Sequence, residues 1–130
     1  MGDYRTPLRR ARGLGSAKHG VGHFIAQRVS AVALVLLVCW GFSQTPFLVR
    51  GGHDFARAWL ASPLNATLLI LLAGVGFYHG QIGMQVIIED YVDRGAGRTA
   101  LLILNAFVWL AAAALTTVSL LLVALGRGAV

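Results

Sequence analysis

Charged side chains are scarce in this sequence, and their scarcity constrains the class of protein. Asp, Glu, Lys and Arg together make up 12% of the 130 residues, whereas 57% of the residues are hydrophobic. Soluble domains contain about a quarter charged residues. The composition therefore argues against a soluble globular domain and indicates a membrane protein.

Cysteine is almost absent as well. The single cysteine, Cys39, lies within an apolar run, so the chain can form no internal disulfide and supplies no cysteine cluster for an iron–sulfur centre. We expect Cys39 to be a small packing residue. The sequence also lacks a flavin-binding fingerprint and has little length outside its apolar runs. We therefore assign no catalytic residue and expect that this chain alone is not an enzyme.

Long apolar runs are the main feature that is present. A bilayer core about 30 Å thick requires roughly 20 apolar residues for each spanning helix, and three segments reach that length. Ser62-Pro63 and Gly95–Gly97 predict where the second and third helices begin. The sequence thus predicts an all-α membrane protein with one three-helix transmembrane domain. The predicted boundaries are 1–28 for a basic N-terminal segment, 29–125 for the membrane domain with spans at about 29–49, 64–88 and 100–125, and 126–130 for a short tail.

The basic residues predict the orientation of these spans. Eight Lys and Arg residues fall in the N-terminal segment and the second loop, and three fall in the first loop and the tail. The positive-inside rule then predicts a cytoplasmic N-terminus and a periplasmic C-terminus. The first apolar run is too long for a signal-peptide core, so we expect a multi-pass protein of a bacterial inner membrane. Topology and lipid headgroups explain the basic N-terminus, and no nucleic-acid partner is expected.

A histidine, His79, lies in the middle of the second apolar run. An imidazole at that depth is costly unless it is paired, faces a bundle interior or binds a ligand. Small residues on its helix face would admit another backbone or a flat macrocycle, and imidazole is an axial ligand of haem iron. A histidine that only hydrogen-bonds a neighbouring helix is the alternative. At about 100° per residue, the helix face that contains His79 comprises Leu72, Gly76, His79, Gly83, Val86 and Asp90.

The same run ends in an acidic residue and a tyrosine. Tyr91 lies twelve residues after His79, which corresponds to about 18 Å of helix. A carboxylate at a helix C-terminus opposes the macrodipole, so Asp90 is not explained as a stabilising residue. Tyr91 alone would suit an interfacial aromatic belt. Together, Asp90 and Tyr91 indicate a small polar site for a lipophilic ligand near the cytoplasmic surface.

Two motifs make this chain resemble the hydrophobic membrane-anchor subunit of succinate dehydrogenase. The second run carries the pattern H-x3-G-x6-D-Y, from His79 to Tyr91. Residues 20–34 (GVGHFIAQRVSAVAL) carry the pattern G-V-x2-F-x3-R-x-[ST]-A. The resemblance covers about residues 15–125 and implies three spans with the N-terminus inside.

The resemblance also implies roles for four residues. His79 would be one axial ligand of haem b, with the other supplied by a larger, cytochrome b-type anchor subunit. Tyr91 would hydrogen-bond a ubiquinone carbonyl, and Asp90 would help to order that site. Arg28 would lie near the haem propionates and the quinone pocket, as a planar bidentate donor can, or would act only as a topology anchor.

The other three histidines occupy positions that neither motif fixes. His23 lies five residues before Arg28 and could approach the same site, whereas His19 and His53 are expected at the surface.

The expected function is therefore that of an anchor. The chain would hold a flavoprotein subunit and an iron–sulfur subunit at the membrane and pass electrons from succinate to ubiquinone, in the citric acid cycle and respiratory chain. An anchor of a fumarate reductase or another quinone-linked complex is one alternative. A haem-free three-helix assembly protein, in which His79 only forms a hydrogen bond, is the other.

Overall fold

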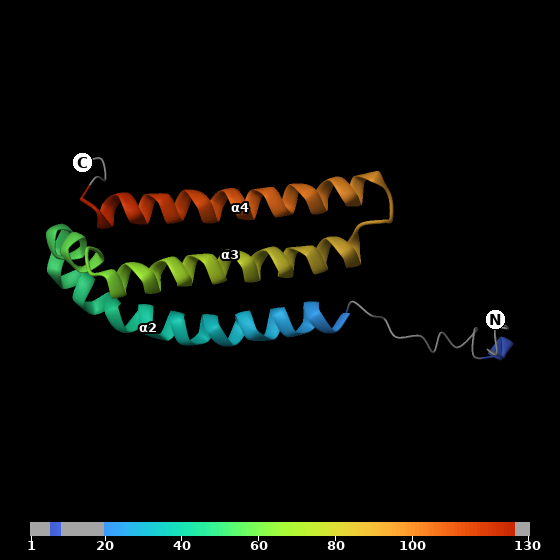
Figure 1. Cartoon of the computed structure of the whole chain (residues 1–130), viewed down its shortest axis with the longest axis horizontal. Coiled ribbons are helices and arrows are strands. Elements are labelled where there is room, and N and C mark those ends of the chain that lie inside the picture. The colour runs from blue at the N-terminus through green and yellow to red at the C-terminus, as the bar shows by residue number, and fades with distance from the viewer. Residues whose placement is uncertain (1–5, 9–19, 127–130) are drawn as a thin grey trace, which may run out of the picture.

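Three long helices make up the protein in a computed structural model that describes residues 6–8 and 20–126 (Figure 1). They are α2 (Gly20–Leu60), α3 (Pro63–Tyr91) and α4 (Ala96–Ala124). All three are long and apolar enough to cross a membrane, which confirms the predicted all-α, three-helix fold. Most of the basic segment 1–28, and all of the tail 126–130 except Gly126, lie outside the described residues. The side of the membrane on which each terminus lies stays a prediction.

Helix α3 lies between the other two helices, and consecutive helices run in opposite directions (Figure 1). Short connections at 61–62 and 92–95 produce this antiparallel order. As predicted, Ser62 is the N-cap of α3 and Pro63 begins it, while Gly95 precedes α4. Because α2 and α4 share few contacts with one another, both α2 and α4 leave a long apolar face uncovered. Side chains such as Phe42 and Leu115 are largely exposed, as expected for surfaces that meet lipid or other subunits.

Helix α2 extends beyond the predicted span 29–49 and kinks near its C-terminal end. The kink is at Gly52, whose φ of 69° lies in the left-handed region that glycine adopts without steric cost. The Phe55 side chain lies where a Cβ on Gly51 would be. After the kink, residues 53–60 form a short helical segment where the sequence analysis placed a loop. Trp59 stacks on Trp40 with ring centroids 5.8 Å apart. This contact joins the segment after the kink to the part of α2 before it.

A polar contact joins α3 to α4 in the middle of the bundle. Asn105 is 7% exposed; its Nδ2 donates to the Gln81 carbonyl at 3.0 Å, and its Oδ1 accepts a hydrogen bond from Trp109 Nε1 at 2.8 Å. The Trp109 ring, thus oriented, covers Gly80. A Cβ on Gly80 would lie 2.9 Å from the ring edge. Gly80 is therefore a packing residue, because only a missing side chain lets the indole lie this close.

This packing predicts a difference between two glycines of α3. Gly80→Ala should lower the free energy of unfolding by about 1 kcal/mol, because overpacking against Trp109 outweighs the gain in helix propensity. Gly74→Ala should be neutral or stabilising, since a Cβ at Gly74 meets nothing within 4 Å. SDS-induced unfolding of the purified protein, followed by circular dichroism, measures both. Equal effects of the two substitutions would contradict this assignment.

Candidate functional site

The contact between α2 and α3 is centred on Ser30 and His79. Ser30 Oγ lies 2.9 Å from His79 Nδ1, and these residues are 49 positions apart in the chain. Ser30 is only 5% exposed, and its hydroxyl also donates to the Gln27 carbonyl at 3.1 Å. His79 is half-buried. The intramembrane histidine is therefore paired through one ring nitrogen with the neighbouring helix.

The histidine face of α3 is covered by α2 over only part of its length. A Cβ on Gly76 would lie 3.8 Å from the Leu34 side chain, and a Cβ on Gly41 would lie 3.7 Å from Leu72. Helical phase thus placed Leu72, Gly76 and His79 correctly on one packed face. One turn beyond His79, a Cβ on Gly83 would meet nothing within 4 Å. The face therefore opens toward the Tyr91 end of the helix.

The second ring nitrogen of His79, Nε2, makes no hydrogen bond to the described part of the chain. Within residues 6–8 and 20–126, no three or more His, Cys, Asp or Glu side chains gather to hold a metal ion. A haem iron would need only one imidazole from this chain. A ring nitrogen of His79 without a hydrogen-bond partner among the described residues fits that requirement.

Arg28 lies two residues before Ser30 on α2, so it is close to the depth of His79. Its side chain is exposed, and its guanidinium carbon lies 5.1 Å from the centroid of the Phe24 ring. This cation–π contact orients the charge along the outer surface of α2. Arg28 also lines a shallow, open depression with apolar residues of the same helix. The guanidinium is thus available to an anionic group outside this chain.

Asp90 and Tyr91 lie apart from the histidine, at the end of α3. Both are exposed, Tyr91 at 86%, and neither side chain makes a hydrogen bond to the described residues. The neighbouring Glu89 differs, because it accepts a hydrogen bond from Gln85 Nε2 at 2.8 Å. The structure thus brings Ser30 and His79 into contact and places Arg28 at a similar depth on the exposed side of α2. It leaves Asp90 and Tyr91 exposed at another depth.

The remaining histidines differ in their surroundings. His53 is exposed and lies 3.6 Å from the Asp54 carboxylate, as expected for a surface residue. His23 is in the first turns of α2, and its Nε2 is buried without a hydrogen-bond partner among the described residues. His19 lies outside the described residues.

Two polar residues that hold the helices together received no role in the sequence analysis. Ser30 appeared only as a motif position, and Asn105 was treated as part of an apolar span. An asparagine within such a run is itself a signal, because a polar amide at membrane depth needs a partner. Nothing in the sequence could pair Ser30 with His79.

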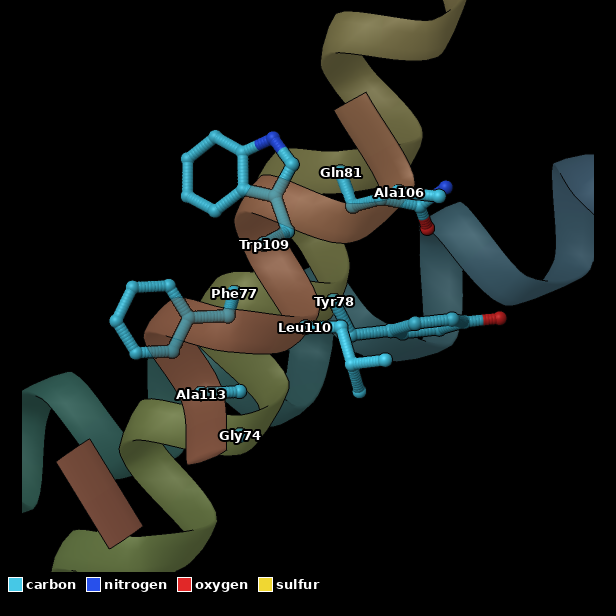
Figure 2. A pocket seen from close by; sticks show the side chains of 8 residues that line it. All are labelled: Gly74, Phe77, Tyr78, Gln81, Ala106, Trp109, Leu110 and Ala113. Atoms are coloured by element: carbon cyan, nitrogen blue, oxygen red, sulfur yellow. The ribbon is translucent and has the colours of Figure 1, made fainter. Parts of the chain in front are cut away.

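A second depression lies between α3 and α4 (Figure 2). Phe77 and Trp109 point the same way on one side of it, with ring centroids 5.9 Å apart, and Tyr78 and Leu110 lie on the other side. Its lining is mainly apolar, and none of the predicted site residues contributes to it. This groove is therefore separate from the histidine site.

Three apolar helices joined by a few buried polar contacts define a small helical membrane subunit, and comparison with known proteins identifies its family. Residues 2–123 match the family model described as succinate dehydrogenase/fumarate reductase transmembrane subunit. The chain belongs to this family, which confirms the resemblance inferred from the two motifs.

Named relatives agree with this membership. A Rickettsia bellii protein named succinate dehydrogenase hydrophobic membrane anchor subunit is 34% identical over 101 residues, which cover 78% of this chain and 81% of the relative. A Paracoccus denitrificans protein of the same name is 32% identical over 111 residues, covering 85% and 86%. No solved structure gives a significant match.

Proposed function

We propose that this chain is the hydrophobic membrane-anchor subunit of a succinate dehydrogenase and that it binds haem b jointly with a second anchor subunit. The observation that carries the proposal is His79, whose Nδ1 is bonded to Ser30 while Nε2 has no partner in the described chain. The names of the relatives support the anchor role and favour succinate dehydrogenase over fumarate reductase.

The residues around His79 fit one side of a haem site. His79 would hold the haem iron through Nε2, and a cytochrome b-type partner subunit would supply a second ligand. Gly83, one turn further along the same helix face, has open space where a Cβ would be, as a flat macrocycle lying against this face would require. Arg28, exposed and near the same depth, would pair with a propionate in a charge-assisted hydrogen bond. When bound, haem b supplies a one-electron redox centre close to the quinone site.

Tyr91 and Asp90 would contribute to ubiquinone reduction. The Tyr91 hydroxyl would donate a hydrogen bond to a quinone carbonyl and stabilise the negative charge that develops on its oxygen. Asp90 would orient that hydroxyl or help to admit protons from the cytoplasmic side. Both side chains are exposed in the isolated chain, so a partner surface would have to complete the pocket. The iron–sulfur subunit, which delivers the electrons, is the partner that this role requires.

The chain's part in the enzyme is thus to anchor and to connect. Flavin chemistry and the iron–sulfur centres would reside in the two soluble subunits, since this sequence has the motifs for neither. The complex would oxidise succinate in the cytoplasm and reduce quinone within a bacterial inner membrane.

The haem assignment predicts the effect of removing the imidazole. In the purified complex, His79→Ala should abolish or strongly reduce the b-haem band in reduced-minus-oxidised spectra, because the chain loses its iron ligand. His53→Ala, which removes an exposed imidazole, is the matched control and should leave the band unchanged. An unaltered b-haem band in an assembled His79→Ala complex would favour the haem-free alternative, in which His79 only hydrogen-bonds.

The quinone assignment predicts a separation of two activities. Tyr91→Phe should reduce succinate–quinone turnover at least tenfold, in line with the loss of one stabilising donor. Succinate–dye activity should be retained, since the soluble subunits still function. Tyr78→Phe removes a hydroxyl from the same helix on the groove side and serves as the control. Near-parental quinone turnover in Tyr91→Phe would argue against this role.

The proposed orientation predicts which loop is accessible from each side. After Cys39→Ser, a single cysteine introduced as Asp93→Cys should react with a membrane-impermeant maleimide only in inverted vesicles. A cysteine introduced as His53→Cys should react only in intact spheroplasts. Both positions are exposed in the isolated chain, so labelling of the chain expressed without its soluble partner subunits reports sidedness rather than burial. The opposite labelling pattern would show that the chain is inserted in the reverse orientation and would contradict the proposed topology.

A further inference from the structure

We infer that Ser30 is a positioning residue for haem: it holds His79 in the tautomer that carries its proton on Nδ1 and thereby presents Nε2 to the iron. This inference rests on the proposed function, and it adds a residue of α2 to a ligand that α3 supplies. The inference depends on the distances from Ser30 Oγ to the Gln27 carbonyl and to His79 Nδ1. It also depends on the burial of Ser30 and on the single proton of its hydroxyl group.

The first step is the single proton of the Ser30 hydroxyl. A serine hydroxyl donates one hydrogen bond and can accept others. Oγ lies 3.1 Å from the Gln27 carbonyl, and a carbonyl oxygen can only accept. The hydroxyl proton is therefore directed to Gln27, in a side-chain-to-backbone bond common within helices. At the 2.9 Å contact with His79, Oγ must then act as the acceptor.

The second step concerns the imidazole. If Oγ accepts, Nδ1 must donate, and a neutral ring protonated on Nδ1 has its lone pair on Nε2. The other tautomer would use the hydroxyl proton for Nδ1, so the bond to Gln27 would be lost. It would also leave an N–H at Nε2 without an acceptor in the described chain. The Nδ1–H tautomer satisfies two hydrogen bonds where the alternative satisfies one.

The third step is the rigidity of this contact. Ser30 is buried, so water does not compete strongly for the bond. On the same helix pair, Leu34 packs against Gly76 and Leu72 against Gly41, which holds the backbones of α2 and α3 close together. The direction of the imidazole is therefore fixed by a second helix, and not only by the rotamer preference of α3.

Such a bond has a measurable consequence at a metal. Histidine ligands commonly donate their free N–H to an oxygen, which fixes the tautomer and raises the basicity of the ligating nitrogen. A more basic imidazole favours ferric over ferrous iron, so the Ser30 bond should lower the midpoint potential of the haem. Removing the acceptor should raise that potential and weaken haem retention.

The test compares Ser30→Ala with Ser43→Ala in the complete purified complex. Both substitutions remove a serine hydroxyl from α2 that donates to the carbonyl three residues earlier, and the Ser43 bond to Trp40 measures 2.6 Å. Ser43 is exposed and does not contact His79. We expect Ser30→Ala to raise the b-haem midpoint potential and to weaken haem retention against an apomyoglobin acceptor about tenfold. Ser43→Ala should change neither, and Ser30→Thr should restore both.

The possible outcomes distinguish this inference from the proposed function. Parental potential and haem retention in Ser30→Ala, in a complex from which His79→Ala removes the haem, would overturn the role of Ser30 alone. A parental haem spectrum in His79→Ala would instead overturn the proposed function. If Ser30→Ala does not assemble, Ser30→Cys replaces the hydroxyl by a weaker acceptor of similar size. An upward shift in its potential would support the inference, and an unchanged potential would contradict it.

Discussion

The hydrogen bond between Ser30 and His79 is the contact on which the arrangement of α2 against α3 depends. It joins residues 49 positions apart at 2.9 Å and so fixes the register of α2 against α3. This register brings Arg28 to a level near that of His79. Within α3 itself, Tyr91 lies about 18 Å further along the helix. An imidazole at membrane depth is costly without hydrogen bonds. The Ser30 contact satisfies Nδ1, and Nε2 has no partner among the described residues.

The two faces of α3 serve different purposes. Toward α4, Gly80, Asn105 and Trp109 form a close contact with both amide ends of Asn105 in use. Toward α2, small residues and His79 form a contact that ends at the open position of Gly83. The first face closes the bundle, and the second leaves part of a site exposed. Together with the long apolar faces of α2 and α4, this is the form expected of a subunit that is completed by lipid and partner chains.

The sequence allowed a large part of this description to be predicted. Three apolar runs predicted three helices, Ser62-Pro63 marked the start of α3, and helical phase placed Leu72, Gly76 and His79 on one face. The kink at Gly52 and the helical segment after it were missed, because the stack of Trp40 on Trp59 is a tertiary contact. The partner of His79 was missed for the same reason. The roles of Arg28, Asp90 and Tyr91 stay predictions, because these exposed side chains make no hydrogen bond to the described residues.

The central claim is that His79 ligates a haem shared with another subunit while its Nδ1 remains on Ser30. A cryo-electron microscopy structure of the complete complex tests it most directly. We expect a haem whose iron is bonded to His79 Nε2 and to a ligand from the second anchor subunit, with the Ser30 contact intact. A haem ligated entirely by other residues, or His79 packed against protein on all sides, would contradict it.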